Sequence, residues 1–323
     1  MVSRAETKLN LAGIIVRIRQ PGKIRNNLWY LGREESAVYL LEGRDESMLI
    51  SGGMNYLVPI VLRQFSDFAI DTERITKILI LHAHFDHVGI VPFFKRSRPD
   101  LTVYASARAW ERLGMPETIE TINAFSSNAL ERMDMVEACS AYDLTWRNDI
   151  SGVIVSEGER IELGEMPVQI YETPGHSSCS ISAYVPTMKV LFPSDAGGVP
   201  YKQTIITSGN SNYTQFQQSL EKLKDLEVDY LCADHYGYVT GDEARDFIAR
   251  AIELAHEHRK KMEHLYRRTQ DVNVAAKKMV NSIYTAHPDY FLSPHVLEGV
   301  YRQMVRHIAG CMEPAANPGA STS

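Results

Sequence analysis

A run of three histidines and one aspartate directly follows an apolar segment, and this feature constrains the fold more than any other in the chain. Residues 78–81 read Ile-Leu-Ile-Leu and predict a buried strand, and the run HAHFDH occupies residues 82–87. Side chains alternate along a strand, so His82, His84 and Asp86 share one side, and a turn would bring the last histidine beside Asp86. Four potential ligands therefore leave the end of one strand together.

These side chains predict a metal site, because neutral imidazole and carboxylate are ligands that suit zinc, iron or manganese. Three later segments have the same form, an apolar strand-like stretch that ends in a polar residue beside a glycine. They present His176 in TPGHS, Asp195 in SDAGG and His235 in ADHYG. A carboxylate can bridge two cations, which an imidazole does not normally do. The set is therefore large enough for two metal ions.

Composition limits the other classes of function. The chain has 323 residues, 44% of them hydrophobic, and 34 basic against 40 acidic residues give a net charge of -6. No basic tail is present, so we expect no nucleic-acid partner. No apolar run has the length of a signal sequence or membrane span, so we expect no membrane association and a cytoplasmic location. The four cysteines form no CxxC pair, which argues against a disulfide framework or a cysteine zinc site.

Strands that alternate with helices predict an α/β sandwich in the first part of the chain. Periodicity predicts a helix over residues 56–68 and another over 89–95. Short apolar runs bounded by turn residues predict strands at 13–19, 28–31, 36–41, 48–51 and 102–105.

Further along, apolar residues recur at helical spacing between 107 and 149, which predicts a helical insertion. More strands are predicted at 152–155, 159–163, 168–172, 180–185, 190–192 and 230–233. A helix over 214–226 has Asn212 or Ser211 as a candidate cap. After residue 241 the chain is predicted to be helical throughout, with three helices that start near Asp242, Asp271 and Ser293.

The ordered motifs HAHFDH, TPGHS, SDAGG and ADHYG resemble the ligand set of the metallo-β-lactamase-fold hydrolase superfamily, over roughly residues 13–241. The resemblance implies a four-layer αββα sandwich with two divalent metal ions, zinc first, with iron or manganese as alternatives. Within the superfamily the chain is similar to hydroxyacylglutathione hydrolases (glyoxalase II) and to the quinolone-signal response protein. The implied ligands are His82, His84 and His176 for one metal, Asp86, His87 and His235 for the other, and Asp195 as the bridge.

The resemblance, the helical pattern after residue 241 and the small, polar composition of the last residues together predict a division of the chain into parts. Residues 1–241 would form the metallo-β-lactamase-fold domain with its insertion at about 107–149, residues 242–312 a helical extension, and 313–323 a flexible tail.

One departure from the family is evident. Many members have an Asp-x-Gly turn after the early strands, and this chain has Ser51-Gly52-Gly53, so Ser51 cannot give the charged support that an aspartate gives to the ligands.

The expected activity is hydrolysis of an ester or thioester of a small molecule by a metal-bridging hydroxide. Asp86 would act as a ligand and also orient the hydroxide and accept its proton, which makes it the candidate catalytic residue. Substrate contacts are expected from the loop at 198–212 and from the helical additions. Candidate hydrogen-bond donors to substrate are Tyr201, Tyr213, Tyr236 and Tyr238.

Other functions remain open at this point. The ligands could hold a diiron centre that binds oxygen or does redox chemistry, although flavodiiron proteins usually have glutamate where this chain has His84. The protein could instead be a signalling or partner-binding protein with incidental hydrolase activity, whose helical additions form a homodimer surface. Lactonase or phosphodiesterase activity is also compatible with the fold.

Overall fold

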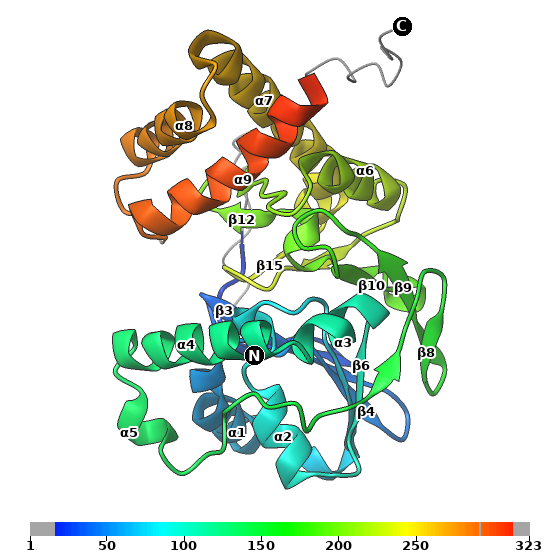
Figure 1. The fold of residues 1–323 in the computed structure, drawn as a ribbon. Coiled ribbons are helices and arrows are strands. Elements are labelled where there is room, and N and C mark those ends of the chain that lie inside the picture. The colour runs from blue at the N-terminus through cyan, green and yellow to red at the C-terminus, as the bar shows by residue number, and fades with distance from the viewer. Residues whose placement is uncertain (1–16, 291, 313–323) are drawn as a thin grey trace, which may run out of the picture.

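The computed structural model describes residues 17–290 and 292–312, and two β-sheets lie at its centre with helices on their outer faces (Figure 1). In the first sheet the spatial order of the strands is their chain order. Strands β1 to β4 are antiparallel and β4 to β7 are parallel. The strands are β1 Gly22–Arg25, β2 Leu28–Arg33, β3 Ser36–Glu42, β4 Ser47–Ile50, β5 Ile75–Leu79, β6 Thr102–Ala105 and β7 Val153–Ile154.

The second sheet has the order β15-β14-β11-β10-β9-β8 and is antiparallel except between β11 and β14. A separate hairpin pairs β12 with β13. The bounds are β8 Arg160–Leu163, β9 Met166–Glu172, β10 Ile181–Val185, β11 Val190–Phe192, β12 Val199–Tyr201, β13 Thr204–Ile206, β14 Tyr230–Cys232 and β15 Tyr238–Thr240.

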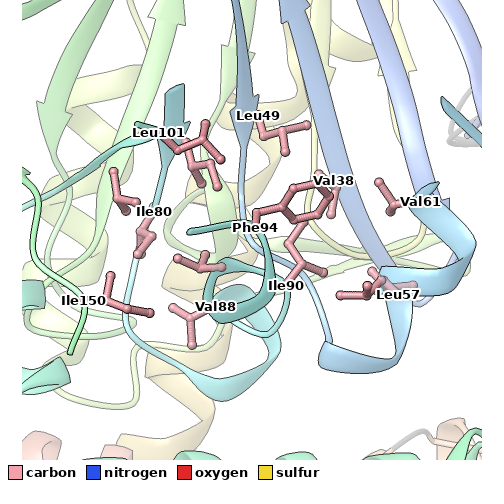
Figure 2. Packing of buried hydrophobic residues seen from close by; sticks show 14 of the residues in the cluster. Val38, Leu49, Leu57, Val61, Ile80, Val88, Ile90, Phe94, Leu101 and Ile150 are labelled. Carbon is pink, nitrogen blue, oxygen red and sulfur yellow. The ribbon is translucent and has the colours of Figure 1, made fainter. Parts of the chain in front are cut away.

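Three apolar cores separate the four layers. Tyr39 and Phe192 meet in the core between the sheets, where their rings lie 5.5 Å apart in an edge-to-face contact. On the outer face of the first sheet, Val38 and Leu49 face Phe94 of a helix (Figure 2). This face is covered by α1 Val58–Asp67, α2 Val91–Ser97, α3 Ala107–Leu113, α4 Pro116–Arg132 and α5 Val136–Cys139.

The third core lies on the outer face of the second sheet, where Leu231 of β14 packs in one cluster with Phe216 and Phe247. The helices on this side are α6 Tyr213–Leu223, α7 Asp242–Thr269, α8 Val272–Ala286 and α9 Pro294–Met312. The start signals of α6 and α8 act as caps, since the Asn212 side chain accepts a hydrogen bond from Gln215 N and that of Asp271 from Asn273 N. Asp242 is instead the first residue of α7, whose N-cap Gly241 has no side-chain cap. The layers are therefore αββα, and the predicted fold class and C-terminal helices are confirmed. Within the described ranges, no helix combines the length and apolar character needed to cross a membrane.

The predicted elements differ from the structure mainly in short segments. The strand predicted at 13–19 begins outside the described residues, and its described part forms only an isolated bridge between Ile18 and Tyr238. The tail at 313–323 also lies outside the described residues. The hairpin of β12 and β13 and the strand β15 were missed, because runs of three residues give too little periodicity to distinguish a strand from a loop. The structure has α3, α4 and α5 in the range predicted to be helical, 107–149.

Candidate metal centre

The HAHFDH run leaves the first sheet where β5 ends, and the chain then changes conformation. Ile80 and Leu81 stay buried, His84 is still extended, and a single 3-10 turn, η3, spans Phe85–His87. This turn brings Asp86 and His87 to a second cluster with His235, while the ring of His87 stays 3.9 Å from that of His82. The run therefore contributes to two neighbouring clusters, as its spacing predicted.

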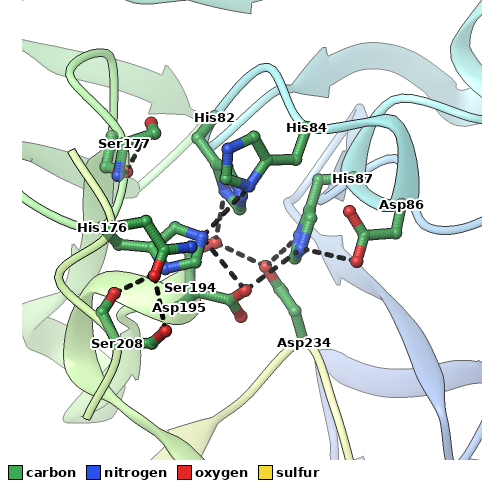
Figure 3. Close-up of polar contacts among 12 residues, drawn as sticks. His82, His84, Asp86, His87, His176, Ser177, Ser194, Asp195, Ser208 and Asp234 are labelled. Carbon is green, nitrogen blue, oxygen red and sulfur yellow. Dashed lines mark hydrogen bonds and ion pairs between the residues drawn. The ribbon is translucent and has the colours of Figure 1, made fainter. Parts of the chain in front are cut away.

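The first cluster consists of His82, His84 and His176. The Nδ1 atom of His84 lies 3.1 Å from Nε2 of His82 and 3.1 Å from Nε2 of His176 (Figure 3). Three ring nitrogens at this spacing surround one point, which is the arrangement that a tetrahedral metal site with three imidazoles requires.

The loop that carries His176 depends on a glycine. Gly175 has φ +133°, and a Cβ atom there would lie 2.2 Å from the backbone nitrogen of Phe216 in α6. Only glycine permits this close approach of loop and helix. Ser211 and Asn212 then donate their backbone N–H groups to the Gly175 carbonyl at 3.0 Å, which attaches the loop to the start of α6.

The second cluster consists of Asp86, His87 and His235, and His235 comes from the loop after β14. Asp86 Oδ2 lies 3.7 Å from Nε2 of His87 and 3.7 Å from Nε2 of His235, and the two imidazole nitrogens are 3.3 Å apart. The side chain of His87 is fully buried, whereas that of Asp86 is 21% exposed. The carboxylate is thus the member of the pair that solvent and a small molecule can reach.

Asp195, in the 3-10 turn η5 Ser194–Gly197, lies between the clusters. Its Oδ2 atom is 3.4 Å from Nε2 of His176 and 3.5 Å from Nε2 of His87, and its Oδ1 atom is 3.5 Å from Nε2 of His235. The Oδ1 atom is buried and makes no hydrogen bond within the described part of the chain. A buried carboxylate that faces three imidazoles has the position and the free lone pairs of a bridging ligand.

Hydrogen bonds on the outer side of four imidazoles fix which nitrogen faces the centre. The Nδ1–H groups of His176 and His235 donate to the carbonyls of Ser208 at 2.9 Å and Glu35 at 2.7 Å. His87 Nδ1 lies 2.9 Å from Asp234 Oδ2, and His82 Nδ1 lies 3.1 Å from Ser194 Oγ. With the proton on Nδ1, each Nε2 lone pair points inward. This is the tautomer that a metal-binding histidine needs.

Asp234 supplies the charged support that Ser51 lacks. Its Oδ2 atom accepts hydrogen bonds from His87 and from Ser194 Oγ at 2.6 Å, on the side away from the cavity. Ser51 is fully buried, and its hydroxyl has no hydrogen-bond partner among the described residues. Asp234 was not identified from the sequence. The only available signals were its position directly before His235 and the missing aspartate at 51.

Burial and mutual interactions shift the pKa values of these groups in opposite directions. Burial, together with the facing imidazole of His176, lowers the pKa of His84 to about 4. Burial alone would lower the pKa of His235, but the Asp195 and Asp86 carboxylates raise it to about 9. Burial alone would raise the pKa of Asp195, yet the imidazoles around it, His235 first, hold it well below its ordinary value. In the metal-free protein the first cluster is therefore neutral, and protons are held in the second cluster.

A cavity of about 570 Å³ opens in front of the clusters. Five of the seven predicted ligands line it, and His82 and His87 lie fully buried behind them. The structure does not bring the predicted substrate tyrosines to this lining. Tyr213 is buried and donates to the Ala255 carbonyl at 3.1 Å, and Tyr201 stacks edge-on against Tyr236 at 5.5 Å.

Tyr238 is buried as well, in the core between the sheets. The tyrosines that do line the cavity are Tyr290 and Tyr301, from the chain before α9 and from α9 itself. Sequence periodicity gave no sign of this, because Tyr301 lies on the same apolar stripe of α9 as core residues.

The donor set fits divalent cations. Five imidazoles and two carboxylates supply borderline and hard ligands, and no lysine or arginine of the described chain belongs to the lining. The seven predicted residues thus meet at one edge of the two sheets, the edge where β5, β9, β11 and β14 end.

Several solved structures are similar to this chain. A metallo-beta-lactamase family protein from Thermus thermophilus is 18% identical, with a TM-score of 0.60 over 90% of this chain and 95% of that chain. An archaeal metallo-beta-lactamase superfamily protein from Sulfolobus tokodaii is 17% identical, with a TM-score of 0.53 over 88% of this chain and 99% of that chain. A HARLDQ motif mutant of a metallo-beta-lactamase from Cronobacter sakazakii is 19% identical, with a TM-score of 0.57 over 77% and 99%.

At these identities the structural similarities support the fold alone. The sequence model described as "Metallo-beta-lactamase superfamily" matches residues 31–235, which is more than half of the chain and spans every residue of the two clusters. The chain therefore belongs to the metallo-beta-lactamase superfamily.

Proposed function

We propose that the protein is a dinuclear metal-dependent hydrolase that cleaves an ester or thioester bond of a small molecule. The position of Asp195 supports this most strongly, because its Oδ2 atom lies 3.4 Å from His176 Nε2 and 3.5 Å from His87 Nε2. A carboxylate shared by two three-residue clusters suits two metal ions better than one. We expect zinc, with iron or manganese as alternatives, since imidazole and carboxylate serve all three.

When bound, two divalent ions supply Lewis-acid polarisation of a carbonyl and make a water molecule nucleophilic near neutral pH. The residues of the chain would perform the remaining tasks. Asp86 is the exposed carboxylate of the second cluster, so we assign it the orientation of the attacking water and the acceptance of its proton. His84 and His235 also line the cavity and would help to position the reacting bond.

The choice of bond rests on chemistry and resemblance together. An acyl carbonyl needs only one nucleophile and one electrophilic centre, which the two clusters can provide within one cavity. The similarity of the HAHFDH motif to hydroxyacylglutathione hydrolases motivates the inclusion of thioesters. The mild net charge of -6 and the lack of lysine or arginine in the described lining argue against RNA phosphodiesters.

The test is turnover of ester, thioester and lactone panels before and after removal of metal with a chelator. We expect activity that is lost on chelation and restored by Zn²⁺, Mn²⁺ or Fe²⁺. His84→Ala should lower kcat/KM by at least about 100-fold, because a ligand and a cavity group disappear together. His264→Ala, on the exposed side of α7, is the matched control and should behave as wild type. Activity that survives chelation and the His84→Ala change would overturn the proposal.

A further inference from the structure

Two helices, one from the helical insertion and one from the C-terminal extension, form walls of the cavity in front of the clusters. One wall is α4, which contributes Ile122 and Phe125, and the facing wall is α9, which contributes Leu297, Val300 and Met304. In Figure 1, α4 belongs to the helical layer of the first sheet and α9 to that of the second. Much of the cavity wall therefore comes from the helical insertion and the C-terminal extension.

Two exposed apolar side chains also border the cavity. Phe125 is 44% exposed and Val296 is 39% exposed, and both belong to the lining. The ring of Phe125 stacks on that of Phe85, next to the ligand Asp86, with 5.2 Å between centroids. Exposed large apolar side chains that border a cavity mark a surface where an apolar molecule can gain free energy by leaving water.

Three polar residues of the wall, Thr207, His258 and Tyr301, form hydrogen bonds with one another. His258 Nδ1 lies 3.2 Å from the Thr207 carbonyl and 3.0 Å from Thr207 Oγ1, and its Nε2 atom lies 2.9 Å from the Tyr301 hydroxyl. Burial lowers the pKa of His258 to about 4, so this imidazole carries no charge at neutral pH. Apart from residues of the metal clusters, Glu117 is the one charged side chain among the described residues that line the cavity.

We propose that the substrate is a neutral molecule whose apolar portion, an alkyl chain or an aromatic ring, fills the cavity between α4 and α9. This inference rests on the proposed hydrolase function and names its substrate class. A negative charge remote from the reacting bond would enter an apolar space with no lysine or arginine among its described lining residues, and it would meet Glu117. Esters and lactones of uncharged molecules thus fit the cavity better than thioesters of anionic carriers, whose charged groups would have to stay outside it.

The kinetic test uses the metal-loaded enzyme and one leaving group with acyl chains of increasing length. We expect kcat/KM to rise about fourfold for each added methylene until the cavity is full, because each buried methylene contributes roughly 0.8 kcal/mol. Esters of the same length that end in a carboxylate should react at least about tenfold more slowly than their methyl-ended counterparts. A flat chain-length profile, or equal rates for the carboxylate series, would overturn the substrate class while leaving the hydrolase function intact.

A binding measurement separates the two proposals. Titration calorimetry compares decan-2-one with 9-oxodecanoate, which share the ketone and the chain and differ in a terminal methyl or carboxylate group. We expect decan-2-one to bind at least about tenfold more tightly. If decan-2-one binds more tightly and no ester of the panel is turned over, the proposed hydrolase function is wrong. The cavity would then still bind neutral apolar molecules, as ligands and not as substrates. Equal binding of the two ketones would contradict the class directly.

Two tryptophan variants of α9 test where the apolar portion of the substrate binds. Val300 lines the cavity and is only partly buried, so Val300→Trp should narrow the cavity without displacing a core side chain. The acyl chain length with the highest kcat/KM should become shorter, because the indole ring occupies volume that the end of the chain would otherwise fill. Arg306→Trp, on the exposed side of the same helix, should keep the wild-type profile. An unchanged optimum in Val300→Trp would place the apolar portion elsewhere and refute the assignment.

Discussion

Asp234 Oδ2 lies 2.9 Å from Nδ1 of His87, on the side of the imidazole that faces away from the cavity. The same oxygen accepts a hydrogen bond from Ser194 Oγ, which in turn lies 3.1 Å from Nδ1 of His82. One buried carboxylate is thus linked to one imidazole of each cluster. It fixes the two rings from behind, and the side chain at position 51, serine in this chain, is not needed for that purpose.

Asp234→Ala should weaken metal binding by about 10–100-fold, the usual cost of losing a carboxylate that orients a metal-binding histidine. Competition with a chromophoric chelator measures the affinity. Asp246→Ala, an exposed position on α7, is the control for the loss of one negative charge. If both variants bind metal as tightly as the wild type, Asp234 has no part in orienting His87.

Gly175→Ala should destabilise the fold by several kcal/mol and reduce metal content, because the new Cβ would lie 2.2 Å from the Phe216 nitrogen and displace the His176 loop. Gly158→Ala is a control with a comparable backbone, since Gly158 also has positive φ but a Cβ atom there would meet no other atom within 4 Å. That variant should lose only about 1 kcal/mol. Chemical denaturation of both proteins makes the comparison, and equal losses would refute the close-approach argument.

Metal-free and metal-loaded protein should respond oppositely to pH. In the metal-free protein the pKa of His235 is raised from 6.5 to about 9, so the stability that its protonation contributes is complete below pH 6.5 and is lost as pH rises through about 9. A cation must displace this proton, so metal should bind more tightly and stabilise more as pH rises over the same range.

Thermal unfolding with and without chelator, from about pH 6 to about pH 9.5, measures both trends. His235→Gln removes the titrating group and should flatten the metal-free profile. If the difference in unfolding temperature between the metal-loaded and the metal-free protein does not increase with pH, protons and metal do not compete at His235.

Much of the site could be predicted from the sequence because its geometry follows from strand ends. His82, His176 and His235 each follow an apolar segment, and neighbouring strand ends in packed sheets meet at one edge. The local turn η3 accounts for the rest, since it brings Asp86 and His87 to a second cluster beside the first. These relations join residues that are close together in the sequence, so a pattern of residue types is enough to predict them.

The loop at 198–212 and the helical additions were expected at the site, and residues of both line the cavity. The particular side chains of the cavity walls could not be predicted in this way. Ile122 of α4 and Leu297 of α9 are 175 positions apart in the chain, and periodicity shows only that each helix has an apolar face. Whether that face meets a core or borders a cavity depends on how the helical layers are placed. Tyr213 illustrates the difference, because it directly follows the Asn212 cap near the site loop, yet its hydroxyl points into the core.

The central claim is that Asp195 joins two metal sites in one centre, and metal stoichiometry tests it most directly. Elemental analysis of the purified chain, loaded with a divalent metal and freed of excess, should give two ions per chain. His84→Ala and His235→Ala should each lose at least one of them, while His264→Ala should keep both. A wild-type chain that holds one ion or none under saturating metal would contradict the dinuclear centre.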